Sequence, residues 1–317
     1  MKTFPDIHPH AFVHQRDRAA LDTLRSVPGI DTFLRRVSSG TIEGQMRLER
    51  MANTLRLGPT QYPSLYAMVE RACAVLDVPV PEVYLDSGYT INAWAFGFES
   101  YTVTLYSGLV DLLREEEIQA VVGHEIGHIA CEHMLYKSSA DVLRMLGSAL
   151  LKKYFGGVAE LALAPIELAL LTWSRAAEYS CDRAALLVVQ DPEVVASALA
   201  SIGGGASLRW RDEFSMESLI AQAEELEAAT TREGVMAQAL DAARQLTTTH
   251  PDPIDRAREI LRWSRGPEYE LICAGKYDTR SKVAQLPGIV GVRTCPSCAA
   301  AVEDDWKFCK RCGGGLE

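Results

Sequence analysis

The stretch V121-V-G-H-E-I-G-H-I-A130 decides which fold we expect for this chain. It places His124 and His128 four positions apart, with Glu125 directly after the first histidine and apolar residues on either side. On an α-helix, residues four positions apart lie on the same face, so both imidazoles can point at one metal ion. The alternative is a helix with an ordinary polar face, and the surrounding sequence has to decide between the two.

The residues before this stretch predict a small sheet, followed by the helix that carries the histidines. Three segments are rich in β-branched and aromatic residues and are separated by turns that contain Gly or Ser: EVYLD (82–86), INAWAF (91–96) and YTVTLY (101–106). Three glutamates, 115–117, then stand where the N-terminus of a helix favours negative charge. We expect a sheet that is antiparallel in part and a helix directly after it.

The rest of the chain is predicted to be mainly helical. Apolar residues recur at three- and four-residue spacing within 17–77, and a further helix is expected from about 172 to 190. More helices are expected at 193–202, about 212–247 and 253–265. The fold class that follows is α+β, mainly helical, with a small sheet.

A second pair of residues supplies what a zinc site on the two histidines still lacks. Such a site needs a third protein ligand and an open position for water. Glu178 and Asp182 are again four positions apart on an expected helix, so one carboxylate can bind zinc while the other orients a ligand histidine. With H-E-x-x-H, in which the glutamate takes a proton from the zinc-bound water, this gives a His₂Glu site.

Composition and charge limit the function. Of the 317 residues, 48% are apolar and 23% charged, which is expected for one main domain with a small appendage. The net charge of −10 argues against a nucleic-acid-binding surface spread over the molecule, because neutralising phosphates needs clustered Lys and Arg. The N-terminal residues contain no apolar secretory signal, so a cytoplasmic location is expected.

The most apolar region, residues 142–173, is interrupted too often by charges to span a membrane. Its longest uncharged runs are the seven residues 145–151 and the seven residues 168–174. A membrane span needs about 20 mainly apolar residues. We expect a pair of core or interfacial helices there. Contact with a membrane surface is the less favoured alternative, because interfacial amphipathic helices have a similar sequence.

Four motifs, in this order, resemble those of the gluzincin metallopeptidases of the HtpX and CAAX prenyl-protein endopeptidase (Oma-like) type. They are N92-A-W-A-F-G97, H124-E-I-G-H128, E178-Y-S-C-D182 preceded by Ser174 and Arg175, and T249-H250-P251 followed by Arg256. The resemblance implies a zincin-like metallopeptidase domain, a catalytic zinc ion, and hydrolysis of peptide bonds in polypeptide substrates. It does not imply which substrate is cleaved.

Residue roles follow from the resemblance position by position. Glu125 would be the general base and acid, and Asp182 would accept a hydrogen bond from a ligand histidine, with Arg256 nearby. His250 would donate a hydrogen bond to the developing oxyanion, although its position alone favours a loop-start residue before Pro251. The ligands of the catalytic zinc would be His124, His128 and Glu178.

The segment 92–96 resembles the edge strand along which the family binds an extended peptide by its backbone. Trp94 and Phe96 alternate along this strand, and that pattern alone is more typical of core residues than of pocket residues. The predicted substrate-binding residues are Asn92, Ala93, Trp94 and Phe96.

Three residues close to the motifs carry weaker expectations. Cys131 and Cys181 are spaced to approach the metal-binding face, and they are expected to be small buried thiols, with a redox or inhibitory role as the alternative. His133 lies off the metal-binding face of the predicted helix and is expected at the surface.

The C-terminus predicts a second, structural zinc ion. Four of the eight cysteines form two CxxC pairs with ten residues between them, Cys295 with Cys298 and Cys309 with Cys312. Each pair can present two thiolates to one tetrahedral zinc, and four thiolates leave no position for water. A redox-active dithiol is the alternative. So small a zinc ribbon should unfold without its metal.

We expect four parts along the chain. They are an N-terminal helical region that packs on the protease (1–77), a zincin-like metallopeptidase core (78–265), a linker (266–291) and a zinc ribbon (292–317). Protein quality control is a role suggested by the resemblance only. No feature of the sequence specifies an oligomeric state.

Two other functions compete with a zinc endopeptidase. One is a protease-like scaffold that retains zinc and uses its groove and ribbon to hold partners; the presence of both Glu125 and His250 argues against it. The other is a membrane-associated protease that acts on membrane proteins through residues 142–173.

Overall fold

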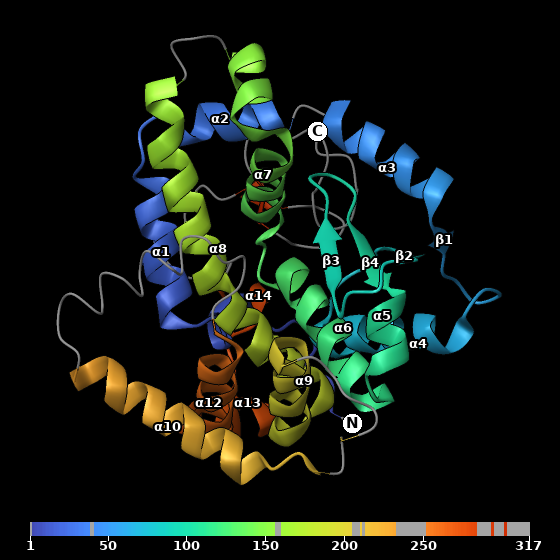
Figure 1. The fold of residues 1–317 in the computed structure, drawn as a ribbon, viewed down its shortest axis with the longest axis vertical. Helices are drawn as coiled ribbons and strands as arrows, with labels where there is room; N and C mark the ends of the chain where they lie inside the picture. Colours follow the sequence, from blue (N-terminus) through green and yellow to red (C-terminus); the bar gives the residue numbers. More distant parts are fainter. Residues whose placement is uncertain are drawn as a thin grey trace.

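Helix α6 (Glu115–Ala130), which carries His124 and His128, lies between a small sheet and the long helix α8 (Glu160–Val189) (Figure 1). The structure, a computed structural model, describes residues 2–38, 41–155, 160–204, 210, 213–232, 252–283, 293–294 and 301–302. Within these ranges, helices surround a small four-stranded sheet, and two further short strands near the C-terminus form a separate pair. The mainly helical α+β fold that the sequence predicts is therefore confirmed.

The N-terminal region is helical, as predicted, apart from one short strand. Helix α1 lies along α8, and α4 packs against α6 (Figure 1). Helix α4 ends at Leu76, and Asp77 follows with a left-handed φ of 51°, shortly before Pro79 and Pro81. The elements are η1 (Pro9–Ala11), α1 (Gln15–Arg25), α2 (Ile30–Val37), α3 (Thr41–Asn53), β1 (Leu55–Arg56) and α4 (Pro63–Leu76).

The sheet contains the three predicted strands and β1. They are β2 (Glu82–Asp86), β3 (Ala93–Phe96) and β4 (Thr102–Tyr106), in the order β1-β2-β4-β3. Strand β2 is parallel to β4, whereas β1 with β2 and β3 with β4 are antiparallel pairs, which confirms the partly antiparallel sheet. Strand β3 is thus an edge strand, and it contacts α6.

Two glycines let α6 and α8 pack at close range. A Cβ atom on Gly127 would lie 2.7 Å from the Cβ of Ala184, and one on Gly123 would lie 2.9 Å from the Cβ of Val188. Side chains larger than hydrogen at these positions would force the helices apart. The close approach brings the carboxylates of α8 against the histidines of α6.

The remaining helices complete the shell around α6 and α8. Helix α9 packs on α6 and on α12, and α10 lies outside α12 (Figure 1). The helix expected over 212–247 is described only as far as residue 232. These helices are α5 (Ser107–Leu112), α7 (Met134–Phe155), α9 (Pro192–Gly204), α10 (Met216–Arg232), α12 (Pro253–Ser264), α13 (Pro267–Cys273) and α14 (Arg280–Val283).

The part of the expected linker that the structure describes differs from the expectation, because it folds into α13 and α14. Ile272 is buried in the main core, and Thr279 forms an isolated β-bridge with Ile7. Burial of an apolar side chain favours a packed helix over an extended connection. Residues 267–283 therefore pack on the body of the molecule.

Among the described residues, the core consists of two hydrophobic clusters. The larger one joins α4, β2, β4, α6, the C-terminal half of α8, α9 and α12. The second joins α1, α2 and α7 to the first half of α8, and it includes Trp173 and Phe96. Helices α6 and α8 connect these clusters, so the two carboxylates and two histidines lie deep inside the protein.

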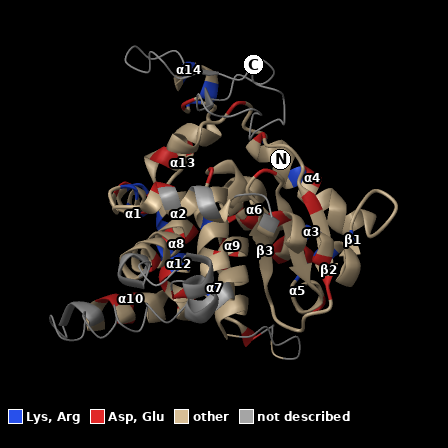
Figure 2. Ribbon diagram, turned by 90° about the horizontal axis from the view of Figure 1, so that it is seen from above, with Lys and Arg blue, Asp and Glu red and all other residues tan. Residues whose placement is uncertain are grey.

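Two further properties concern the apolar character of the helices and the distribution of charge. Within the described residues, no helix combines the length and the apolar character that crossing a bilayer requires. Acidic and basic residues are spread over many elements (Figure 2). They are interleaved along α1 and α12, as the sequences QRDRAALDTLR and PIDRAREILRWS show.

Candidate metal centre

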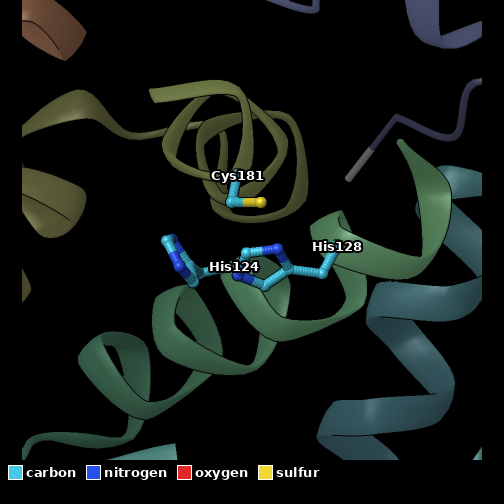
Figure 3. A group of neighbouring side chains, drawn as sticks. All are labelled: His124, His128 and Cys181. Carbon is cyan, nitrogen blue, oxygen red and sulfur yellow. The ribbon is translucent and has the colours of Figure 1, made fainter. Parts of the chain in front are cut away.

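His124 and His128 project from α6 toward α8 (Figure 3). The Nε2 atom of His124 lies 3.4 Å from Oε2 of Glu178, and the Nε2 atom of His128 lies 3.5 Å from Oε1 of the same residue. All three side chains are buried. One carboxylate from α8 thus faces both imidazoles of α6, each with a different oxygen.

Asp182 and Arg256 hold His124 and Glu178 in this arrangement. The Nδ1 atom of His124 lies 3.1 Å from Oδ1 of Asp182 and donates to it, so Nε2 is the ring nitrogen that faces Glu178. Arg256, on α12, donates to both oxygens of Asp182 over 2.8 and 2.7 Å. Its Nη1 atom lies 3.2 Å from Oε2 of Glu178. A single guanidinium therefore contacts both buried carboxylates.

The pKa values of the two histidines are shifted in opposite directions. Burial lowers the pKa of His124, but the charges of Glu178 and Asp182 more than offset this effect and raise it to about 9. Burial keeps the pKa of His128 well below its ordinary value. Burial also raises the pKa of Asp182, but Arg256 and His124 outweigh it, so that pKa is lowered. In the metal-free protein, one proton on His124 occupies the position in which a metal cation would bind.

Cys181 competes with Glu178 as a third metal ligand. Potential ligand atoms of His124, His128 and Cys181 all lie within 4.8 Å of one another (Figure 3). The Cys181 thiol is fully buried, which raises its pKa well above the ordinary value and disfavours the thiolate that binds metal. Its sulfur lies 3.7 Å from Nδ1 of His133, whereas Glu178 faces both Nε2 atoms. The geometry favours Glu178.

Glu125 lies between the histidines and the edge strand. Its Oε2 atom accepts a hydrogen bond from the backbone N–H of Ala95 in β3 over 2.8 Å. Lys137 donates to the backbone carbonyl oxygen of Ala95, also over 2.8 Å. Burial lowers the pKa of Lys137, but Asp141 and Glu125 outweigh it and raise that pKa. Both outward-facing backbone groups of Ala95 are therefore bonded to side chains.

A cavity of about 240 Å³ opens beside the metal-binding face. It contains Glu125 together with His124 and Glu178. Its lining comes from α6, α8, α9 and α12, and from residues 90–93 at the start of β3. The apolar lining residues are Ile91, Ala93, Ala120, Val121, Ala185, Val195, Ala198, Leu199, Ile202 and Pro253.

The four residues that the sequence predicts to bind substrate separate into two groups. Asn92 and Ala93 line the cavity. Trp94 instead lies beneath the guanidinium of Arg50, 4.5 Å from its ring centre, and Phe96 is buried in the second hydrophobic cluster. Side chains two positions apart on a strand share a face, so Trp94 and Phe96 both point into the second hydrophobic cluster and away from the cavity.

The expectation that His133 lies at the surface is wrong. Its side chain is only 3% exposed, and its Nδ1 atom lies 3.4 Å from Nδ1 of His128. Helix α6 ends at Ala130, and Glu132 follows with a left-handed φ of 61°, so the chain turns back before His133. Helical spacing no longer applies beyond the end of the helix.

Sequence reasoning also missed Asp17, whose Oδ2 atom lies 3.0 Å from Nε2 of His133. No spacing rule connects residues so far apart in the chain. Other predicted site residues, namely His250, Cys295, Cys298, Cys309 and Cys312, lie outside the described residues.

Comparisons with known proteins agree with this geometry. The profile described as "Peptidase family M48" matches residues 59–264. The chain is 30% identical over 284 residues to the chloroplastic plastoglobule-localized metallopeptidase 48 of Arabidopsis thaliana, an alignment that covers 88% of this chain and 80% of that protein.

Bacterial proteases are similar to it as well. A protease HtpX homolog of Burkholderia thailandensis is 28% identical over 241 residues, which cover 70% of this chain and 81% of that protein. A protease HtpX homolog of Ralstonia pickettii is 30% identical over 172 residues, which cover 48% of this chain and 60% of that protein. The chain belongs to peptidase family M48 and is an HtpX-like zinc metallopeptidase.

Proposed function

We propose that His124, His128 and Glu178 bind the zinc ion of this peptidase and that Glu125 is its general base. One observation carries the proposal: both oxygens of Glu178 face the Nε2 atoms of the two histidines, at 3.4 and 3.5 Å. Glu125 stands next to them, at the wall of the cavity. The arrangement combines three metal ligands, a base and space for a substrate.

The residues fit a catalytic zinc site by their chemistry. Two imidazoles and one carboxylate are a common ligand set of catalytic zinc in peptidases, which keeps a further position for water or substrate. Asp182 fixes the Nδ1–H tautomer of His124, and Arg256 contacts both carboxylates with its positive charge. When bound, zinc polarises the peptide carbonyl and makes its water molecule more acidic.

The protein groups then carry the proton. Oε2 of Glu125 takes a proton from the attacking water and delivers it to the nitrogen of the leaving amine. In this structure that oxygen accepts from the Ala95 N–H, which aims the carboxylate toward the cavity rim. We assign His250 as the donor to the oxyanion; removing one such donor typically costs about 10²- to 10³-fold in turnover.

Polypeptides are the substrates, and we propose that they bind by their backbone along the start of β3. An edge strand can pair with an extended peptide and thereby recognise main chain more than side chains. We place this pairing at Asn92 and Ala93 because they line the cavity. The Ala93 N–H donates to Oδ1 of Asn92 in this structure, so the substrate backbone would have to displace that side chain. Main-chain recognition suits unfolded proteins, so we propose a role in protein quality control.

We further propose that the four C-terminal cysteines bind a second, structural zinc ion. The short strands β5 (Arg293–Thr294) and β6 (Ala301–Val302) form an antiparallel pair on either side of the first CxxC, which supports a ribbon. Four thiolates leave no open position, so this ion has no catalytic role.

Proteolysis assays test the proposed catalytic residues. Zinc-loaded protein is incubated with unfolded casein and with a denatured-proteome peptide library, beside Glu125→Gln with the same zinc content, and the products are analysed by mass spectrometry. We expect internal cleavages with the wild type and a loss of at least about 10²-fold with Glu125→Gln. Equal rates for the two proteins would exclude Glu125 as the base. No cleavage by zinc-loaded wild type would contradict the proposed function itself.

A further inference from the structure

His133 and Asp17 form a buried chain that ends at His128. His133 lies between the two, with Nε2 3.0 Å from Oδ2 of Asp17 and Nδ1 3.4 Å from Nδ1 of His128. The exposed fractions are 1% for Asp17, 3% for His133 and 2% for His128. The other ring nitrogen of His128, Nε2, faces Glu178. Three side chains therefore connect the N-terminal helix to the metal-binding face.

Asp17 is held in place by several donors. Its Oδ1 atom accepts from the indole N–H of Trp173 over 3.0 Å, and its Oδ2 atom accepts from the hydroxyl of Ser180 over 2.6 Å. Asp17 also lies in the first turn of α1, where the helix dipole favours a carboxylate. The indole N–H, the hydroxyl and the nearby Nε2 of His133 all face its oxygens, which is the arrangement that an ionised carboxylate accepts. An ionised carboxylate only accepts hydrogen bonds.

The donor and acceptor roles along this chain follow from that carboxylate. Asp17 accepts, so Nε2 of His133 carries its proton and, in the neutral ring, Nδ1 carries a lone pair. That lone pair accepts the Nδ1–H of His128, and Nε2 of His128 is left with a lone pair directed at Glu178. Cys181, whose sulfur lies 3.7 Å from Nδ1 of His133, is a weak donor and is compatible with this tautomer.

We propose that Asp17 and His133 are positioning residues of the metal centre, which hold His128 in the tautomer that can bind zinc. The inference rests on the proposed role of His128 as a zinc ligand. It adds a residue from α1, outside the matched family region 59–264, to the supports of the active site. Asp182 supports His124 in a similar way. Each proposed ligand histidine is thus linked to a carboxylate, His124 directly to Asp182 and His128 through His133 to Asp17.

Loss of the Asp17 charge should weaken zinc binding through His133. An amide at position 17 can donate to Nε2 of His133, which places the His133 proton on Nδ1. Nδ1 of His128 must then accept, and its proton moves to Nε2, where it blocks the metal. Removing partners of this kind typically costs about 10- to 100-fold in metal affinity or activity.

The test compares Asp17→Asn and His133→Gln in the full chain. We would measure the dissociation constant of the catalytic zinc against a competing chelator, and the visible absorption of the protein with cobalt(II) in that site. We expect both variants to bind zinc about 10- to 100-fold more weakly and to show shifted cobalt bands. Asp22→Asn, an exposed position on the same helix, should match the wild type.

Leu24→Ala separates positioning from stability. Leu24 is fully buried on α1 and belongs to the second hydrophobic cluster, so its truncation should lower the melting temperature without changing zinc affinity or the cobalt spectrum. If Asp17→Asn and His133→Gln behave like Leu24→Ala, their role is structural and the inference is overturned. If Asp17→Asn does not fold, the His133→Gln result by itself tests the inference, because this substitution leaves the contacts of Asp17 with Trp173 and Ser180 in place.

His128→Ala distinguishes this inference from the proposed function. A cobalt spectrum that His128→Ala leaves unchanged would show that His128 is not a ligand, and the proposed function would fail together with the inference. A spectrum that changes with His128→Ala but not with His133→Gln would overturn the inference alone.

Discussion

Arg256 is the residue that joins the two carboxylates of the metal centre. It donates to both oxygens of Asp182, and its Nη1 atom also contacts Glu178. A lysine at this position carries one point charge and cannot reproduce three directed contacts. We therefore expect Arg256→Lys to weaken zinc binding about 10- to 100-fold, as measured by competition with a chelator.

The matched control is Arg262→Lys on the same helix. Its side chain is 61% exposed, and it pairs with Glu259 at the surface, where such a contact contributes little. Equal zinc affinities for Arg256→Lys and the wild type would show that the guanidinium does not support the site.

His124 and His128 together predict how many protons zinc displaces. The pKa of His124 is raised to about 9, and that of His128 is lowered well below the ordinary value. Between about pH 5.5 and 6.5 the metal-free site therefore carries one proton, on His124, and metal binding should release about one proton at either pH. Apparent affinity should increase with pH, because fewer protons compete with the metal.

Titration calorimetry in buffers of different ionisation enthalpy measures this release, after chelation has emptied the catalytic site. Two histidines with ordinary pKa values near 6.5 would release about 1.8 protons at pH 5.5 and about 1.0 at pH 6.5. Such a decline would contradict the electrostatic asymmetry of the site.

At the scale of elements, the contact between α6 and α8 sets the geometry of the site. A Cβ on Gly127 would lie 2.7 Å from Ala184 Cβ and 3.2 Å from the backbone Cα of Cys181. We expect Gly127→Ala to lower the free energy of unfolding by about 1–3 kcal/mol and also to weaken zinc binding, because Glu178 moves with α8. Urea unfolding and chelator competition measure the two effects.

Gly44→Ala is the control for this substitution. Gly44 also lies inside a helix, but a Cβ there meets nothing within 4 Å. Its replacement should stabilise the protein by up to about 1 kcal/mol, since alanine favours the helix. If Gly127→Ala behaves like Gly44→Ala, the two helices do not need their close approach.

Local sequence patterns predicted most helices and strands, but not which of them pack against one another. The alternating segments became β2, β3 and β4, and the periodic segment around the histidines became α6. Residues 266–291 lack such a pattern, and the helices in their described part depend on contacts with the distant N-terminal segment, such as the bridge from Thr279 to Ile7. Composition alone suggested a linker there.

At the scale of the whole molecule, the proposed ribbon and the protease bind their metals separately. The double variant Cys295→Ala/Cys298→Ala removes two of the four proposed ribbon ligands, so its zinc content should fall from two ions to one per chain. Casein cleavage should persist, since the catalytic site loses no ligand. Elemental analysis with a parallel cleavage assay measures both; loss of both zinc ions would show that the two sites depend on each other.

Sequence patterns could predict the site residues that lie close together in the chain, but not those that are brought together from distant segments. His124 with His128, and Glu178 with Asp182, stand four residues apart on helices, so spacing alone placed each pair on one face. The family resemblance is confirmed by the profile match. Asp17 and His133 escaped prediction, because one approaches from α1 and the other follows a turn that only the three-dimensional fold defines.

Anomalous diffraction at the zinc edge from crystals of the zinc-loaded protein would test the central claim most directly. We predict one peak at about 2.0–2.2 Å from Nε2 of His124, from Nε2 of His128 and from an oxygen of Glu178, apart from any ion in the ribbon. A peak at about 2.3 Å from the sulfur of Cys181, or no peak on this face of α6, would contradict the account.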